Sequence, residues 1–113
     1  MYTEERPWGR FSNLYDEKHT KVKTITVKPS QRLSLQSHAR RSETWTVVQG
    51  QATVQVDEKI FTLDVGQSVS IPVGAKHRLS NETSEPLEII EVQTGSYFGE
   101  DDIVRYEDDY NRS

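Results

Sequence analysis

The sequence predicts an all-β fold, a barrel or a double-sheet jelly roll made of about eight short strands. Three observations lead to this prediction. Apolar and polar residues alternate in most segments, β-branched residues are frequent there, and turn-forming residues separate the segments at short intervals. No stretch longer than a turn or two carries the periodicity and the caps of a helix. Many short strands with regular turns are typical of closed or two-sheet β architectures.

The first barrel strand is expected at residues 21–27, where valine, threonine and isoleucine are frequent. The strands expected after it span residues 32–36, 43–48, 52–56, 60–63, 68–71, 77–81 and 87–93. Turn signals such as Pro29-Ser30 and Gln49-Gly50 separate them. We expect one domain over 1–113, with an N-terminal arm and first strand at 1–19, the barrel at 20–94 and a tail at 95–113. Apolar and aromatic residues between the acidic residues of the tail predict that it packs on the barrel.

Composition is consistent with one small domain and excludes several classes of site and partner. The chain has 113 residues, of which 33% are hydrophobic and 28% charged, so its core is modest and would gain from a metal or a partner subunit. The absence of cysteine excludes disulfides and cysteine-ligated zinc or iron–sulfur sites. No segment resembles a membrane span or a signal core, so we expect a cytoplasmic protein. The net charge of -4 argues against nucleic acid as a partner.

Two of the three histidines belong to a group of possible metal ligands, which consists of Gln36, His38, Glu43 and His77. Gln36 and His38 are two residues apart, so on a strand they point to the same face. Glu43 opens the next apolar run, and His77 would come from a separate strand that crosses the same pocket. Imidazole suits zinc, copper, iron and nickel, while carboxylate and amide oxygens also admit manganese and magnesium. The sequence therefore predicts one divalent metal ion at these four side chains.

The residues around this group resemble those of the cupin superfamily. The intervals from Ser30 through the ligand group to Gly50 are similar to the first cupin motif, and those from Gly66 through Pro72 and His77 to Asn81 are similar to the second. Further segments resemble the phosphomannose isomerase domain of type II mannose-6-phosphate isomerases, namely 6–9, 21–23, 31–36, 88–93 and 99–105. In that family the domain is often fused behind a mannose-1-phosphate guanylyltransferase. The resemblance implies a cupin double-stranded β-helix, and glutamine at position 36 is typical of this branch.

The resemblance also implies an activity, the interconversion of mannose 6-phosphate and fructose 6-phosphate through an enediolate, in mannose, GDP-mannose and polysaccharide metabolism. A divalent ion would stabilise the enediolate. Zinc is favoured, and manganese, nickel, cobalt and iron are compatible with the ligands. Our candidates for proton transfer are Glu91 and Lys23. Arg32 and Arg78 are candidates for the phosphate, because a guanidinium matches a phosphoryl group bidentately, and Gln93 is a candidate at the cavity mouth.

Alternation along the strands predicts which residues share a face. Lys21 and Ile25 are expected to point inward with Lys23, and Ile89 and Gln93 with Glu91. Trp45 and Val47 are expected to point inward with Glu43. If Gln36 points inward, Leu33 and Leu35 face out of the barrel and need a cover. Together with an N-terminal arm that carries Trp8, these leucines predict a homodimer.

Two other functions remain open. Ser37, Ala39, Arg40 and Thr44 stand where the family commonly has a tyrosine or histidines, so the chain could be a metal-bearing cupin for another small sugar or acid. It could also be a non-catalytic module that binds a sugar phosphate or a separately encoded guanylyltransferase, although the intact ligand set argues against this. Arg40 and Arg41 are either cations of the substrate pocket or an exposed loop pair.

Overall fold

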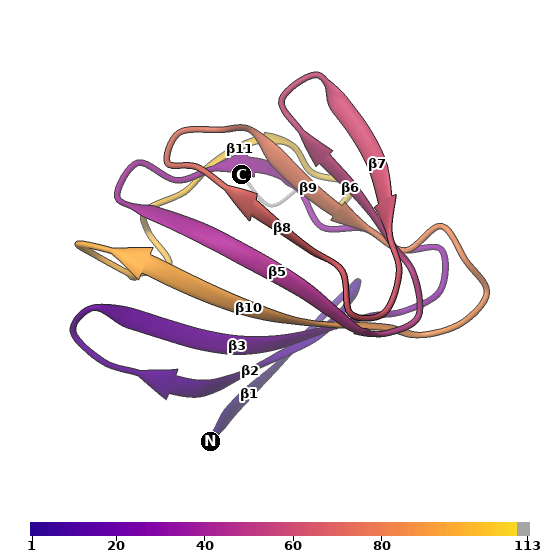
Figure 1. The fold of residues 1–113 in the computed structure, drawn as a ribbon, viewed down its shortest axis with the longest axis horizontal. Coiled ribbons are helices and arrows are strands. Elements are labelled where there is room, and N and C mark those ends of the chain that lie inside the picture. The colour runs from indigo at the N-terminus through magenta and orange to yellow at the C-terminus, as the bar shows by residue number, and fades with distance from the viewer. Residues whose placement is uncertain (111–113) are drawn as a thin grey trace.

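The computed structural model of the chain describes residues 1–110. These residues form two antiparallel sheets and contain no helix (Figure 1). In spatial order, one sheet contains β1 (Tyr2–Arg6), β2 (Gly9–Asp16), β3 (Thr20–Val27), β10 (Leu87–Gly95), β5 (Arg41–Gln49) and β8 (Ser68–Ile71). The other contains β11 (Val104–Glu107), β4 (Leu35–Ser37), β9 (His77–Ser80), β6 (Ala52–Val56) and β7 (Lys59–Leu63). The prediction of an all-β, two-sheet fold is confirmed.

Most predicted strands are observed within two residues of their expected ends, and 52–56 and 68–71 have the expected bounds. The strand expected at 32–36 is the exception, because β4 covers only Leu35–Ser37 and Arg32 makes an isolated bridge with Ser80. The N-terminal arm contains two strands, and β2 pairs with β3 of the same chain. The tail contributes β11, which pairs with β4. Residues 111–113 of the predicted tail lie outside the described residues.

The inward faces of β3, β10 and β5 form three rows across the sheet. The first row is apolar, the second is mixed and the third is polar: they are Ile25, Ile89 and Val47, then Lys23, Glu91 and Trp45, then Lys21, Gln93 and Glu43. All nine residues are buried, so the predicted alternation in these strands is confirmed. The apolar row belongs to the core of the barrel. The core therefore continues into a polar wall along the same three strands.

The prediction that Leu33 faces out of the barrel is wrong, because Leu33 packs against the core and lines a cavity. The alternation fails there because residues 32–34 are not part of a regular strand. Leu35 is only 9% exposed within a single chain, and the tail strand β11 pairs with its strand β4. The two leucines therefore give no support for a second subunit. The homodimer stays a prediction.

No helix among the described residues is long and apolar enough to cross a membrane.

Candidate metal centre and its cavity

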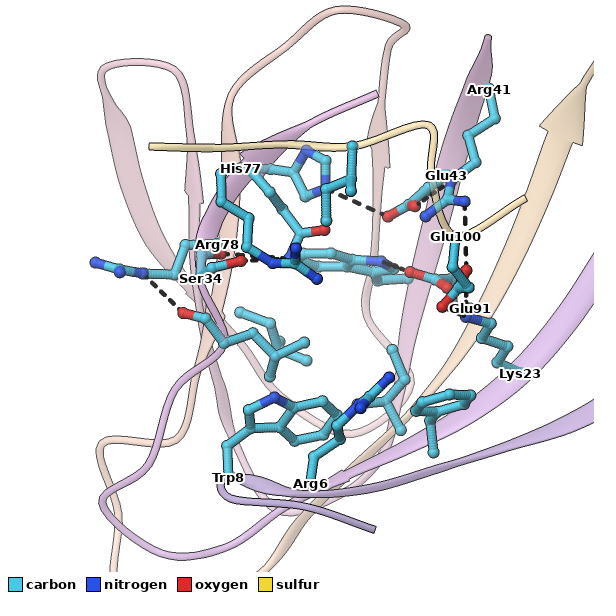
Figure 2. Close-up of a pocket in the computed structure, with 18 residues that line it drawn as sticks. Arg6, Trp8, Lys23, Ser34, Arg41, Glu43, His77, Arg78, Glu91 and Glu100 are labelled. Carbon is cyan, nitrogen blue, oxygen red and sulfur yellow. Dashed lines mark hydrogen bonds and ion pairs between the residues drawn. The ribbon is translucent and has the colours of Figure 1, made fainter. Parts of the chain in front are cut away.

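A cavity of about 100 Å³ lies between the two sheets, at the level of the polar rows (Figure 2). Its lining includes apolar side chains, among them Trp8, Phe11, Ile25 and Leu79. It also includes charged side chains from both sheets and from the tail, among them Lys23, Arg41, Glu43, His77, Arg78, Glu91 and Glu100. A cavity in which apolar walls meet converging polar groups is a usual form of a small-molecule site.

Three of the four predicted metal ligands converge beside this cavity, and two of them, Glu43 and His77, line it. His38, Glu43 and His77 are buried, and one ligand atom from each lies within 4.8 Å of the others. Nε2 of His38 lies 3.3 Å from Oε2 of Glu43, and Nε2 of His77 lies 3.5 Å from Oε1 of Glu43. His38 directly follows β4, Glu43 lies in β5 and His77 opens β9. The pairing of the strands thus brings together residues that are far apart in the sequence.

Both imidazole rings are held by backbone carbonyls. Nδ1 of His38 donates to the carbonyl oxygen of Asp102 at 2.7 Å, and Nδ1 of His77 donates to that of Ala75 at 3.0 Å. A carbonyl oxygen only accepts, so each ring carries its proton on Nδ1 and presents the lone pair of Nε2 to Glu43. Burial, together with the charge of Arg41, lowers the pKa of His38 to about 4, and burial also lowers the pKa of His77. Both rings are neutral at neutral pH, as metal binding requires.

Gln36, the fourth predicted ligand, lines the same cavity and pairs with His77 across β4 and β9. Its amide Nε2 donates to Oγ of Ser34 at 3.0 Å. This bond leaves the amide oxygen, Oε1, as the atom that could bind a metal.

Arg41 is a site residue that the sequence analysis left undecided. Its side chain is buried, whereas that of Arg40 is exposed. Nε of Arg41 donates to Oε2 of Glu43 at 3.0 Å, and Nη2 donates to Nε2 of His38 at 3.2 Å. Alternation in β5 contains the signal that could have identified it, because Arg41 is two residues before the inward Glu43.

Two neutral imidazoles and a carboxylate in a buried pocket fit a divalent metal ion, because these are the donors that zinc and other first-row metals accept. The guanidinium of Arg41 is a competing positive charge at the same donor atoms. A metal ion bound there would require Arg41 to turn away from His38 and Glu43.

Glu91 stands in the row next to Glu43, and its carboxylate is bound on both oxygens. Trp45 Nε1 donates to Oε1 at 2.9 Å, and Gln93 Nε2 donates to Oε2 at 2.8 Å. Burial by itself would raise the pKa of Glu91, but hydrogen bonds from Glu43 and Gln93 and the charge of Lys23 lower it to about 2. Burial and the neighbouring Glu91 carboxylate raise the pKa of Glu43 well above its usual range. Of this pair, Glu43 is therefore the carboxylate that takes up a proton first as the pH falls.

Lys23 and Gln93, two other predicted site residues, also lie at the cavity. Lys23 is 5% exposed, and its Nζ lies 3.2 and 3.3 Å from the two carboxylate oxygens of Glu100. The same Nζ lies 4.4 Å from the centre of the Phe11 ring. Gln93 is fully buried and orients Glu91. Glu100, from the tail, was not among the predicted site residues, and no periodicity in its segment indicated its position.

The two predicted phosphate ligands both pair with the acidic tail. Arg78 lines the cavity, but its guanidinium donates to the carbonyl oxygen of Leu33 at 2.9 Å and to Glu107 at 3.0 Å. Arg32 is not among the residues that line this cavity. It forms a bidentate ion pair with Asp109, with distances of 2.8 and 3.1 Å, and its side chain is 42% exposed.

The family of the chain follows from a comparison with known proteins. The family described as "Mannose-6-phosphate isomerase C-terminal" matches residues 2–108. The chain belongs to this family.

Similar proteins are named for alginate biosynthesis, for xanthan biosynthesis and as a mannose-1-phosphate guanylyltransferase. The "Alginate biosynthesis protein AlgA" of Pseudomonas aeruginosa is 54% identical over 108 residues, which are 96% of this chain and 22% of that protein. The "Xanthan biosynthesis protein XanB" of Xanthomonas campestris pv. campestris is 52% identical over 108 residues, 96% of this chain and 23% of that protein. The "Mannose-1-phosphate guanylyltransferase ManC" of Salmonella typhimurium is 46% identical over 107 residues, 95% and 22%. The chain thus spans less than a quarter of the length of these relatives.

Solved structures agree with the fold. KdgF from Halomonas sp. superposes with a TM-score of 0.80 at 14% identity, over 89% of this chain and 90% of that one. A Cupin 2 conserved barrel domain protein from Salinispora arenicola superposes with a TM-score of 0.69 at 21% identity, over 77% and 76%. The predicted cupin fold is confirmed by these likenesses.

Proposed function

We propose that this domain catalyses the metal-dependent interconversion of mannose 6-phosphate and fructose 6-phosphate, as part of GDP-mannose and polysaccharide metabolism. One observation supports the proposal above all. Glu43 and His77, whose buried donors lie within 4.8 Å of a donor of His38, line the same cavity as the carboxylate of Glu91 and the ammonium group of Lys23. Membership of the mannose-6-phosphate isomerase C-terminal family supports the same activity.

The reaction moves a proton between two neighbouring carbons of the sugar and passes through an enediolate. A divalent ion on His38, Glu43 and His77, with Gln36 as a fourth ligand, would supply Lewis-acid stabilisation of the sugar oxygens. Zinc suits these donors, and manganese, nickel, cobalt and iron are compatible with them.

The residues of the chain supply the proton transfers. Glu91 has its pKa lowered to about 2, so it is ionised at neutral pH, the form in which a carboxylate can accept the proton from carbon. Gln93 and Trp45 hold its two oxygens and so fix its direction. Lys23, opposite Glu91 in the register of β3 and β10, would donate a proton to a sugar oxygen.

The phosphate of the substrate would have to replace a carboxylate of the tail as the partner of an arginine. Arg78 is at the cavity wall, and a phosphoryl group could replace Glu107 as its partner. Arg32 lies at a separate surface with Asp109, so our proposal gives it no part in this cavity.

A coupled assay of mannose 6-phosphate isomerisation tests the proposal, with the metal removed by a chelator and then restored one metal at a time. We expect turnover only in the metal-loaded protein, and loss of turnover in His77→Ala. His19→Ala is the matched control, because His19 is exposed and does not line the cavity. A metal-loaded protein that converts neither sugar phosphate would refute the proposal.

A second candidate is a metal-bearing cupin that binds a sugar phosphate, or another small sugar or acid, without isomerising it. The size of the cavity favours the smaller of these ligands, since about 100 Å³ is small beside the 300–1,000 Å³ that is typical of ligand pockets. Calorimetric titration with mannose 6-phosphate separates the two candidates, because a binding module would show affinity for the sugar phosphate without turnover.

A further inference from the structure

The C-terminal tail contacts His38 of the candidate metal centre through Asp102. Its backbone oxygen accepts the hydrogen bond from Nδ1 of His38 at 2.7 Å. Its carboxylate accepts two backbone N–H groups, that of Ala39 at 3.0 Å and that of Arg40 at 2.9 Å. One tail residue therefore holds both the ring of His38 and the loop that directly follows this ring.

The two histidines of the centre are supported in different ways. His77 is held by the carbonyl of Ala75, two residues away in the same segment, so its support is local. His38 is held by a residue 64 positions further along the chain. The loop after His38 is exposed at Ala39 and Arg40. Its backbone is held by the carboxylate of Asp102 and by the N–H groups of Gly74 and Ser96, which donate to the carbonyls of His38 and Arg40. Of these partners, Asp102 also binds the ring of His38, so the direction of the ring is coupled to the docking of the tail.

We propose that Asp102 is a positioning residue of the metal centre, which fixes the tautomer and the direction of His38 so that Nε2 faces Glu43. The carboxylate anchors Asp102 to the loop, and the anchored carbonyl then binds Nδ1. This inference rests on the proposed metal site and is independent of the isomerase reaction. Partners that orient a metal-bound histidine typically contribute about ten- to a hundredfold to metal affinity.

Metal affinity provides the first test. Zinc and manganese affinities are measured by competition with a chromophoric chelator for the parent protein, Asp102→Asn and Asp102→Ala. The matched control is Asp101→Asn, which removes the same charge from the neighbouring residue, an exposed aspartate whose carboxylate accepts a bond from Tyr97. We expect about a ten- to hundredfold loss in the Asp102 variants and less than about a twofold change in Asp101→Asn. Equal affinities in all variants would overturn the inference.

The tautomer of His38 provides a readout that needs no metal. Nitrogen NMR is recorded on the metal-free protein in an Arg41→Met background, because the guanidinium also donates to Nε2 of His38 and would hold the Nδ1–H tautomer by itself. In this background we expect His38 to be protonated on Nδ1 when Asp102 is present and to be a mixture of tautomers in Asp102→Ala, while His77 stays protonated on Nδ1 in both. A single Nδ1–H tautomer of His38 in both Asp102 variants would overturn the inference. His77 also reports folding, and Asp102→Asn decides the outcome if the alanine variant does not fold. If the parent protein binds no metal, the metal site fails as a proposal, while this spectrum still tests what Asp102 does to His38.

Discussion

The indole nitrogen of Trp45 donates a hydrogen bond of 2.9 Å to a carboxylate oxygen of Glu91. The two residues stand opposite each other in the register of β5 and β10, and each is less than 5% exposed. Trp45 also belongs to the hydrophobic core and makes an edge contact with the ring of His77. A single core residue thus contacts both the candidate base and a candidate metal ligand, so the packing of the barrel fixes the geometry of the cavity.

Trp45→Phe tests this link between the core and the cavity. The variant removes the indole donor and leaves the buried Glu91 with one donor fewer, which should lower the free energy of unfolding by about 1–3 kcal/mol. Urea unfolding measures the change, and Trp8→Phe is the matched control for lost ring volume, because Trp8 is also buried in the core. We expect turnover to fall further in the Trp45 variant, because Trp8 also lines the cavity but does not bond Glu91. A Trp45→Phe protein with the stability and turnover of the parent would contradict the assignment.

His77→Ala should weaken binding of a divalent ion by more than about a hundredfold, because it removes a direct ligand, whereas partners of ligands contribute about ten- to a hundredfold. Chelator competition measures the affinity, and His19→Ala should match the parent. If His77→Ala binds metal as tightly as the parent, the ligand assignment is wrong.

Arg41→Gln should have the opposite effect on the metal. The guanidinium lies 3.0 Å from Glu43 Oε2 and 3.2 Å from His38 Nε2, so it repels a cation that approaches these atoms. Its removal should raise metal affinity by about tenfold or more, about 1.4 kcal/mol. Arg40→Gln is the matched control, since Arg40 is exposed. Equal affinities of the two variants would show that Arg41 does not compete with the ion.

Glu91→Gln should lower kcat by about a hundredfold or more and leave KM nearly unchanged, because proton transfer is needed only in the transition state. Steady-state kinetics with mannose 6-phosphate measures both constants. Glu88→Gln should behave like the parent, because Glu88 lies in the same strand as Glu91 but on its opposite face. Full turnover in Glu91→Gln would remove Glu91 from the mechanism while leaving the isomerase proposal intact.

His38 of the metal-free protein should titrate with a pKa of about 4 in an NMR pH series. Because this value lies below that of an unfolded histidine, His38 contributes stability that is full above about pH 6.5 and is lost as the pH falls toward 4. The loss is at most about 3 kcal/mol. Glu43 acts in the opposite direction, since its raised pKa makes the folded state take up a proton as the pH falls. The ring signal of His38 is therefore a better measure than overall stability, and a pKa near 6.5 would contradict the burial argument.

The sequence by itself determined the all-β class and the inward faces of β3, β5 and β10. Period-two alternation is a local property, and in these strands regular pairing continues along the whole segment, so Lys23, Glu43 and Glu91 share the interior as predicted. The same alternation also predicts that Arg41, two residues before Glu43, points inward. The spacing of the ligand group indicated His38, Glu43 and His77, although their convergence depends on three separate strands.

Only the tertiary structure decided what the tail does. Glu100, Asp102, Glu107 and Asp109 bind Lys23, His38, Arg78 and Arg32. These contacts join residues 29 to 77 positions apart, and no local pattern specifies them. The tail also lies beside β4, where the irregular residues 32–34 break the alternation that had predicted an outward Leu33. The composition of the tail determines its negative charge. The cation with which each carboxylate pairs is determined by packing, because a buried cation must be paired with whichever segment folds over it.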